Sequence, residues 1–147
     1  MRFQNDPDKI LWRLHLRSPI QQVFEALSTD GGRACFWAES AIEQEGVIQF
    51  VFPNGILWEG RILETVPPNR YAVRYYGGSV ATFVLEEDGG GGTDLTLTDQ
   101  GVPPEDRVEV IAGWVSVLMA LKAAVDFGVD LRTHDPQRTW DHRYVEN

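Results

Sequence analysis

The stretch at residues 108–128 reads VEVIAGWVSVLMALKAAVDFG. Its apolar residues recur at helical spacing and predict an α-helix running from about residue 104 to 128. A helix of ~24 residues would span roughly 36 Å, enough to cross a sheet. Between Val110 and Leu121, apolar side chains surround most of this helix, whereas an ordinary surface helix buries a single stripe. We therefore expect more than one of its sides to be covered.

Two apolar stripes run along the predicted helix. The first, which we expect to face a sheet, comprises Val110, Trp114, Val117, Leu118, Leu121 and Val125. The second comprises Val108, Ile111, Val115 and Met119. This second stripe needs another cover, which the tail after Gly128, two short helices or a second subunit could provide. We favour a second subunit or the tail.

Most of the remaining chain is typical of strands joined by short turns. Residues 9–17 alternate between apolar and polar positions, with Ile10, Trp12, Leu14 and Leu16 on one face, which predicts a half-buried strand. Six more strands are expected between about residues 38 and 100. Short turns between them make neighbouring strands antiparallel. The turn signals are Glu45-Gly46, Pro53-Asn54-Gly55, Pro67-Pro68-Asn69, Gly77-Gly78 and glycines 89–92.

Two short helices are expected between the first and second strands. Ser18 suits the N-cap of the first helix and Pro19 its first helical position. Residues 29–32 end that helix, and the second is expected to carry residues 34–37. The apolar stripe of the first helix comprises Ile20, Val23, Phe24 and Leu27.

This order of elements predicts a single α+β domain over residues 1–147. Its curved seven-stranded antiparallel sheet wraps around the long C-terminal helix, an arrangement called a helix grip. The core is expected at about residues 9–128, followed by an extension at 129–147. One domain of this length buries roughly 70% of its unfolded surface.

Composition limits the partners and the compartment. Lys and Arg number 13 against 22 Asp and Glu, a formal charge of −9, which disfavours nucleic acid and membrane surfaces. The uncharged run from Val110 to Leu121 is shorter than the ~20 residues that cross a bilayer. The single cysteine, Cys35, and a start without the apolar core of a signal peptide favour the cytoplasm.

Several motifs, in order, resemble the family of small domains similar to the activator of the heat-shock protein 90 ATPase. This family lies within the START and birch-pollen-allergen-like helix-grip superfamily. The matching stretches are PIQQVFEAL (19–27), FW (36–37), GRILE (60–64), PPNR (67–70), GTDLTLT (92–98) with Gly101, and Gly113-Trp114 followed by Leu118, Leu121 and Lys122. The resemblance implies an apolar cavity between sheet and helix, no shared catalytic residue and no cofactor.

The chain departs from this family pattern in two places. Asp99 stands where many members have a histidine after the Leu-Thr pair. The tail from Val129 to Asn147 is long, contains Trp140 and is expected to be specific to a subgroup.

Aromatic side chains are the best candidates for a ligand site. Most large rings fill protein cores, but a curved sheet cannot close fully on a straight helix, so some rings are expected to wall a cavity. Trp12, Phe50 and Tyr71 belong to the same set of inward or mouth positions. The predicted ligand-binding residues are Trp37, Phe52, Trp58, Tyr75, Phe83, Trp114, Leu118 and Leu121.

Other polar residues have simpler interpretations. A strand, not a helix, follows glycines 89–92, so they form a hairpin rather than a phosphate loop. Cys35 is expected to pack as a small apolar residue, and His15 to be solvated. By strand parity, Glu59, Arg61 and Arg74 also point to solvent. No metal site is expected, because the spacing of His134, Asp135, Asp141 and His142 matches no standard zinc pattern.

The sequence therefore favours a cytoplasmic protein that binds an apolar or aromatic small molecule between the sheet and residues 110–125. A homodimer through Val108, Ile111, Val115 and Met119 is the expected assembly. Two alternatives stay open: a protein-interaction domain such as a chaperone regulator, and a cyclase-like or aromatase-like enzyme. The enzyme would need an ionisable side chain inside the cavity.

Overall fold

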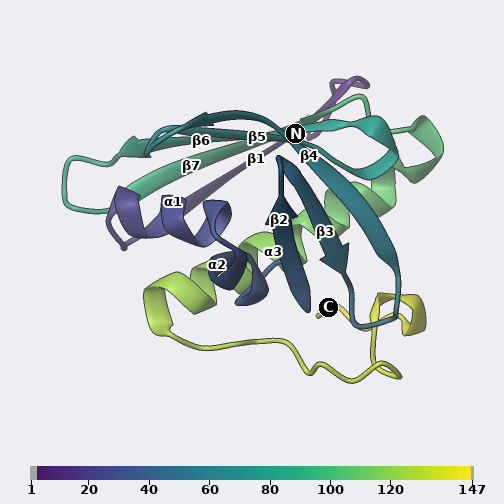
Figure 1. Cartoon of the computed structure of the whole chain (residues 1–147). Helices are drawn as coiled ribbons and strands as arrows, with labels where there is room; N and C mark the ends of the chain where they lie inside the picture. Colours follow the sequence, from purple (N-terminus) through teal and green to yellow (C-terminus); the bar gives the residue numbers. More distant parts are fainter. Residues whose placement is uncertain (1–2, 147) are drawn as a thin grey trace.

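The computed structural model describes residues 3–146 and shows a curved sheet gripping a long helix (Figure 1). All strand pairs are antiparallel, in the order β1-β7-β6-β5-β4-β3-β2. The predicted fold class is confirmed. The strands are β1 (Lys9–Leu16), β2 (Ser40–Gln44), β3 (Val47–Val51), β4 (Leu57–Val66), β5 (Arg70–Arg74), β6 (Val80–Glu87) and β7 (Thr93–Gln100). The helices are α1 (Ile20–Ser28), α2 (Asp30–Ala34) and α3 (Arg107–Phe127), with 3-10 turns η1 (Tyr76–Gly78), η2 (Pro104–Asp106) and η3 (Trp140–His142).

Local backbone features bend the sheet around α3. Glu45 and Gly46 have φ values of 53° and 82°, which gives β2 and β3 a two-residue hairpin turn matched to strand twist. A register shift between Ile62 and Glu64 places a bulge in β4, and bulges increase bending and twist. A Cβ on Gly60 would lie 2.8 Å from the Phe50 ring. Glycine at this position therefore leaves room for the buried Phe50 ring.

The space between the sheet and the middle of α3 is filled by rings. Trp37 is fully buried, and its ring centroid lies 5.1 Å from that of Phe50, 5.5 Å from those of Tyr75 and Phe83, and 6.0 Å from that of Trp114. Interlocked rings of this size leave little free volume. The centre of the grip is therefore a solid core.

Three sides of α3 have different neighbours. Of the first predicted stripe, Trp114, Val117, Leu118 and Leu121 are buried, and Val110 and Val125 are half-buried against the core. The tail covers another side, where Trp140 bonds to Glu109 and the Val145 carbonyl accepts from Ser116. By length and composition Pro104–Phe127 could cross a membrane. In this structure one side of the helix instead packs into the hydrophobic core against the sheet.

The second predicted stripe stays largely exposed in the single chain. Val108, Val115 and Met119 are 80%, 42% and 47% exposed. Ile111 is half-buried, and its carbonyl accepts a hydrogen bond from the Trp12 indole. The tail, one of the two covers that the sequence favoured, therefore lies on a different side of α3.

The two short helices differ from their predicted bounds. Pro19, not Ser18, occupies the N-cap position of α1, and Ser18 makes no cap bond. Thr29 ends α1 and also caps α2, because its hydroxyl accepts from the Gly32 amide at 3.0 Å. Helix α2 consequently begins at Asp30 and ends before Cys35. Phe36 and Trp37 are buried in the following turn.

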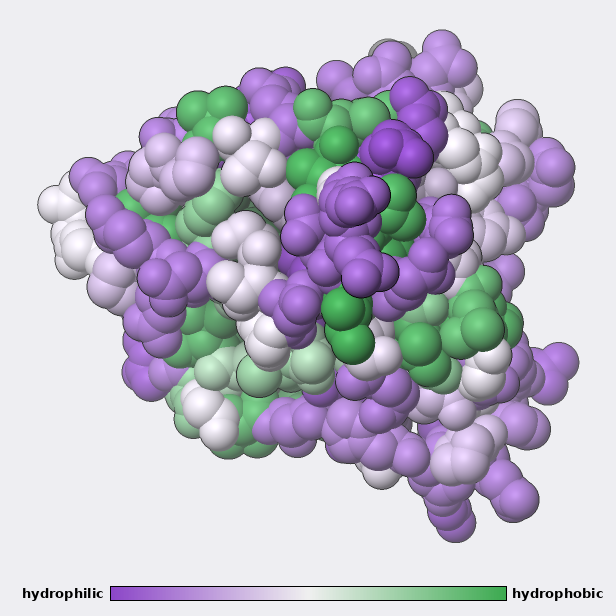
Figure 2. Space-filling view, in the orientation of Figure 1, coloured by the Kyte–Doolittle hydropathy of each residue, from purple (hydrophilic) through white to green (hydrophobic). Residues whose placement is uncertain are grey.

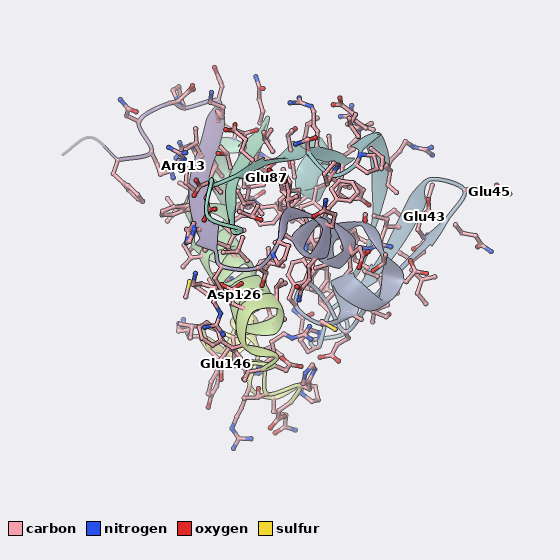
Figure 3. All side chains as sticks on the ribbon, turned by 90° about the vertical axis from the view of Figure 1, so that its left-hand side faces the viewer. Arg13, Glu43, Glu45, Glu87, Asp126 and Glu146 are labelled. Atoms are coloured by element: carbon pink, nitrogen blue, oxygen red, sulfur yellow. The ribbon has the colours of Figure 1, made fainter. Side chains whose placement is uncertain are left out.

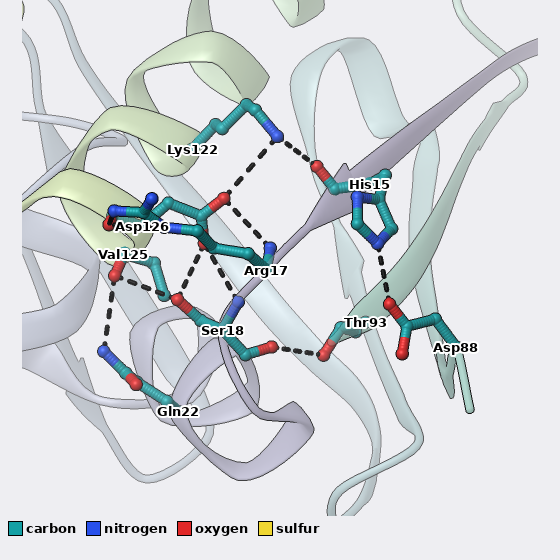
Figure 4. Close-up of polar contacts among 9 residues, drawn as sticks. All are labelled: His15, Arg17, Ser18, Gln22, Asp88, Thr93, Lys122, Val125 and Asp126. Atoms are coloured by element: carbon teal, nitrogen blue, oxygen red, sulfur yellow. Dashed lines mark hydrogen bonds and ion pairs between the residues drawn. The ribbon is translucent and has the colours of Figure 1, made fainter. Parts of the chain in front are cut away.

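Ser18 instead belongs to a junction that fastens the end of α3 (Figure 4). The Asp126 carboxylate accepts from the Ser18 hydroxyl at 2.7 Å, and from the backbone amides of Ser18 and Arg17 at 3.1 Å each. Lys122 lies 3.5 Å from the same carboxylate, and the Arg17 guanidinium donates to the backbone carbonyl of Asp126 at 3.1 Å. Burial by itself raises the pKa of Asp126, but these hydrogen bonds and Lys122 together hold it below its usual value. Strand β1 and helix α3 are thereby joined.

We expect Asp126→Ala to lower the free energy of unfolding by about 2–3 kcal/mol at pH 7, because buried donors lose their acceptor. Urea titration measures this loss, with Glu87→Ala at an exposed position as the control. The folded pKa of Asp126 lies below its unfolded value, so its stabilisation is present above about pH 4 and disappears as the pH falls through the folded pKa. The difference between wild type and variant should narrow in acid; a widening difference would contradict this assignment.

Candidate functional site

A hollow of about 240 Å³ opens at one end of the grip, beside the aromatic core. Its walls come from the β3–β4 connection, the N-terminal half of α3 and the end of the tail, which lie together in Figure 1. Tyr75 and Tyr76 close it from the end of β5. The lining residues are Phe52, Pro53, Asn54, Ile56, Trp58, Tyr75, Tyr76, Asp106, Glu109, Val110, Gly113, Trp114, Val117, Thr139, Trp140 and Asp141.

The eight predicted ligand-binding residues fall into two groups. Phe52, Trp58, Tyr75 and Trp114 line the hollow. Trp37, Phe83, Leu118 and Leu121 are buried in the solid core behind it. The hollow reaches only residues 106–117 of the helix region, whereas the sequence suggested a cavity along residues 110–125.

Trp58 is the centre of the aromatic wall. Its ring centroid lies 4.5 Å from that of Phe52 and 5.3 Å from those of both Tyr75 and Tyr76. Tyr75 in turn lies 5.5 Å from Trp114, across the hollow's inner end. The rings come from different elements and hold one another in place. They form a preformed apolar surface suited to a flat or rounded ligand.

Few polar atoms face this wall. The Tyr75 hydroxyl accepts a hydrogen bond from the Trp37 indole at 3.0 Å. The Trp58 indole N–H approaches the same hydroxyl without hydrogen-bond geometry and has no partner within the described part of the chain. Burial raises the pKa of Tyr75 far above neutrality, so its phenol stays neutral. The wall therefore offers uncharged rings and one unpaired hydrogen-bond donor, the Trp58 indole N–H.

A buried carboxylate orients Trp114 from behind. Asp99 is fully buried on β7, and one of its oxygens accepts from the Trp114 indole at 2.8 Å. Its other oxygen and the nearby Ser79 hydroxyl have no hydrogen-bond partner within residues 3–146. Burial raises the pKa of Asp99, although hydrogen bonding to its charged form opposes this shift. Asp99, which departs from the family pattern, thus positions a residue of the hollow without lining it.

The tail is anchored before it reaches the hollow. The Arg132 side chain, which is 3% exposed, donates to the carbonyls of Ala38 and Ala34 at 2.8 and 2.7 Å. His134 bridges Glu39 and Asp130, with N···O distances of 2.7 and 2.6 Å. These contacts guide the tail back along α3. The lower part of the face in Figure 2, over which the tail runs, is mainly hydrophilic.

Other predicted candidates lie away from the hollow. His15 is exposed and pairs with Asp88 at 2.8 Å, and this contact, with amides of the glycine run, lowers the pKa of Asp88 to about 2. Cys35 is exposed and not packed as a small apolar residue, because α2 ends before it. No group of three His, Cys, Asp or Glu residues within the described part of the chain could hold a metal ion.

Glu59, Arg61 and Arg74 are exposed to solvent, as strand parity predicted. Figure 3 shows Glu43 and Glu45 projecting from the β2–β3 hairpin, whereas Asp126 lies within the outline of the molecule. Arg33, like Arg132, is a buried charged residue that sequence reasoning missed. It is fully buried and donates to the Ala41 carbonyl at 3.0 Å and to Asp30 at 2.6 Å.

Sequence reasoning also missed several lining residues. Asp106, Glu109 and Gly113 share the helical face that carries Val110 and Val117, so helical spacing could have found them. Thr139, Trp140 and Asp141 belong to a tail without periodicity. No sequence signal places them here.

The family comparison agrees with this structure. Residues 17–126 match the family described as activator of Hsp90 ATPase homolog 1-like protein. The chain belongs to this family, and its fold is that of the helix-grip superfamily. The matched range ends before the tail. No curated protein matches the chain.

Solved structures with the same fold include three bacterial proteins. Protein SSP2350 from Staphylococcus saprophyticus shares 24% identity over 84% of this chain and 96% of its own, with a TM-score of 0.73. The Aha1 dimer from Colwellia psychrerythraea shares 20% identity over 82% of this chain and 97% of its own, also at 0.73. CalU16 from Micromonospora echinospora shares 26% identity over 78% of this chain and 72% of its own, at 0.65.

We expect the His134 bridge to make tail anchoring depend on pH. Hydrogen bonds to Asp130 and Glu39 raise the pKa of His134 above 6.5. Its stabilisation is therefore complete below about pH 6.5 and lost as the pH rises through the raised value. His134→Gln should destabilise the protein by less than ~1 kcal/mol at pH 6, as for other solvent-screened pairs, and by almost nothing at pH 9. Urea titrations measure both values; His142→Gln is the control, and a difference that grows with pH would rule the bridge out.

Proposed function

We propose that this protein binds a small apolar or aromatic molecule in the hollow, in the cytoplasm. The observation that carries the proposal is the wall of mutually packed rings around Trp58, open at one end. Burial of a ligand's apolar surface would drive uptake, at roughly 25 cal/mol per Å² less the cost of ordering the complex.

The volume limits the size of this ligand. A cavity of roughly 150 Å³ can hold benzene, and drug-sized ligands occupy roughly 300–1,000 Å³. The hollow, at about 240 Å³, lies between these values. It suits a molecule with one ring or two small fused rings.

The hollow supports a binding function better than a catalytic one. A cyclase-like reaction needs a side chain that exchanges protons near neutral pH inside the site. At the ring wall, Tyr75 does not meet this need, because burial raises its pKa. The carboxylates of Glu109 and Asp141 also line the hollow, but each accepts a hydrogen bond from a wall residue, Trp140 or Asn54. A chaperone-regulating role rests on the family description alone.

Gly113→Leu tests the proposal. Gly113 lines the hollow, and a Cβ there would meet no heavy atom within 4 Å, so a leucine can project into the space without a clash. Helix propensity favours leucine by up to about 1 kcal/mol, so stability should not fall. We expect wild type to retain a ligand in native mass spectrometry, or to bind members of an aromatic library, and Gly113→Leu to lose this binding.

Ala112→Leu is the matched control, because Ala112 is exposed on the next position of the helix. It should bind as wild type does. If wild type neither retains a ligand nor binds any library member, the proposed function fails. Equal binding by Gly113→Leu and wild type would show that the ligand binds outside the hollow.

We also propose that a second copy of this chain covers the stripe of Val108, Ile111, Val115 and Met119. The four residues lie along one side of α3 on successive turns, and Val108, Val115 and Met119 are exposed. A relative with the same fold is described as a dimer. Contiguous apolar surface of this kind commonly marks an interface.

Light scattering tests the dimer. Wild type should have twice the mass of one chain at high micromolar concentration, and Met119→Glu should be monomeric, because a charge would be buried at the interface. Ile42→Glu, which changes a residue of similar exposure on β2, should remain dimeric. A strictly monomeric wild type would refute this assembly.

A further inference from the structure

The hollow carries acidic groups without basic counterparts. Asp106, Glu109 and Asp141 belong to its lining, and within residues 3–146 no Lys, Arg or His side chain does. None of the three carboxylates forms an ion pair in the described part of the chain. Glu109 and Asp141 instead accept hydrogen bonds from neutral donors, the Trp140 indole and the Asn54 amide, at 2.8 Å each. Their negative charge is therefore not neutralised by the protein.

Aromatic faces add to this negative potential. The face of a Trp or Tyr ring is negative and attracts a cation within about 6 Å of its centroid. In a hollow of about 240 Å³, a compact ligand lies close to several rings at once. The rings involved are Phe52, Trp58, Tyr75, Tyr76, Trp114 and Trp140. The rings and the carboxylates thus both favour a positively charged ligand.

Helix stabilisation explains only part of this pattern. Acidic residues near a helix N-terminus interact favourably with its dipole, which accounts for Asp106 and Glu109. It does not account for Asp141, which the tail brings to the mouth of the hollow and Asn54 holds there. The chain's charge of −9 does not account for it either, since 13 Lys and Arg residues were available and none lines the hollow.

The negative charge of these carboxylates also affects the ionisation of Tyr76. Its pKa is raised, first by burial and next by the negative charge of Asp106, with Glu109 and Glu105 adding to the effect. A phenol at the mouth therefore resists ionisation beside the carboxylates. A bound anion would meet the same repulsion.

We propose that the hollow selects an organic cation, a compact ammonium group attached to an aromatic or branched alkyl body. The body would pack on Trp58 and Trp114, and the charge would lie toward Glu109 and Asp141. This inference rests on the proposed function and narrows its ligand class. The neutral apolar body supplies burial, and the charge supplies selectivity.

Three probes of similar shape separate charge from burial. Phenyltrimethylammonium is cationic, tert-butylbenzene is its neutral isostere, and benzenesulfonate is anionic. We expect the cation to bind about tenfold more tightly than the neutral probe, and the anion not to bind. Added salt should weaken cation binding only. Indole N–H signals in ¹H–¹⁵N NMR locate the site: those of Trp58, Trp114 and Trp140 should shift, whereas Trp12, outside the hollow, is the internal control.

A charge-removing pair of substitutions tests the carboxylates directly. Glu109→Gln with Asp141→Asn keeps an acceptor oxygen for Trp140 and for Asn54, so the walls should stay in place. Cation affinity should fall about tenfold, while neutral-probe affinity should not change. The matched control is Glu43→Gln with Glu87→Gln, which removes the same charge at exposed positions away from the hollow (Figure 3).

The possible failures are distinguishable. If the neutral probe binds as tightly as the cation, or the double amide variant binds the cation as wild type does, the cation inference is wrong and the proposed function stands. If no probe binds and no indole signal moves, while the aromatic library also gives no ligand, both fail together.

Discussion

Helix α3 is held across the sheet by two buried carboxylates. One lies on the sheet and accepts a hydrogen bond from the helix, and the other lies on the helix and accepts hydrogen bonds from the connection after β1. Asp99 on β7 receives the indole N–H of Trp114 near the middle of the helix. Asp126 at the end of the helix receives the donors of Ser18 and Arg17 from the β1–α1 connection. Two separated contacts fix both the tilt and the rotation of a rod. They decide which side of α3 meets the sheet, which meets the tail and which remains exposed.

With the helix fixed, ring volume determines where space remains. Trp37 and its aromatic neighbours fill the centre. A second hollow of about 500 Å³ lies between α1, α2 and the C-terminal end of α3, and the gap between the sheet and the N-terminal half of α3 remains at the end beside Trp58. The tail then closes that end with Trp140 and Asp141. Since the family match stops at residue 126, one wall of the hollow comes from outside the matched domain.

The sequence predicted what periodicity and turn chemistry control. The seven strands, the stripe of Ile20, Val23, Phe24 and Leu27, and the buried side of α3 all follow from local spacing. Prediction failed where a residue's partner is distant. Ser18 has the chemistry of a helix cap but bonds to Asp126, and nothing local announces that Arg132 reaches the carbonyls of Ala34 and Ala38. The hollow was misplaced in part because its position depends on how the rings pack.

The aromatic centre of the grip is solid, whereas the end beside Trp58 is hollow, and xenon binding in a crystal checks both statements. Xenon enters apolar cavities and is located by its strong scattering. We expect xenon between Trp58, Trp114 and Trp140, and none between Phe83 on β6 and Leu121 on α3. Xenon deep under the helix, with an empty or collapsed mouth, would contradict both.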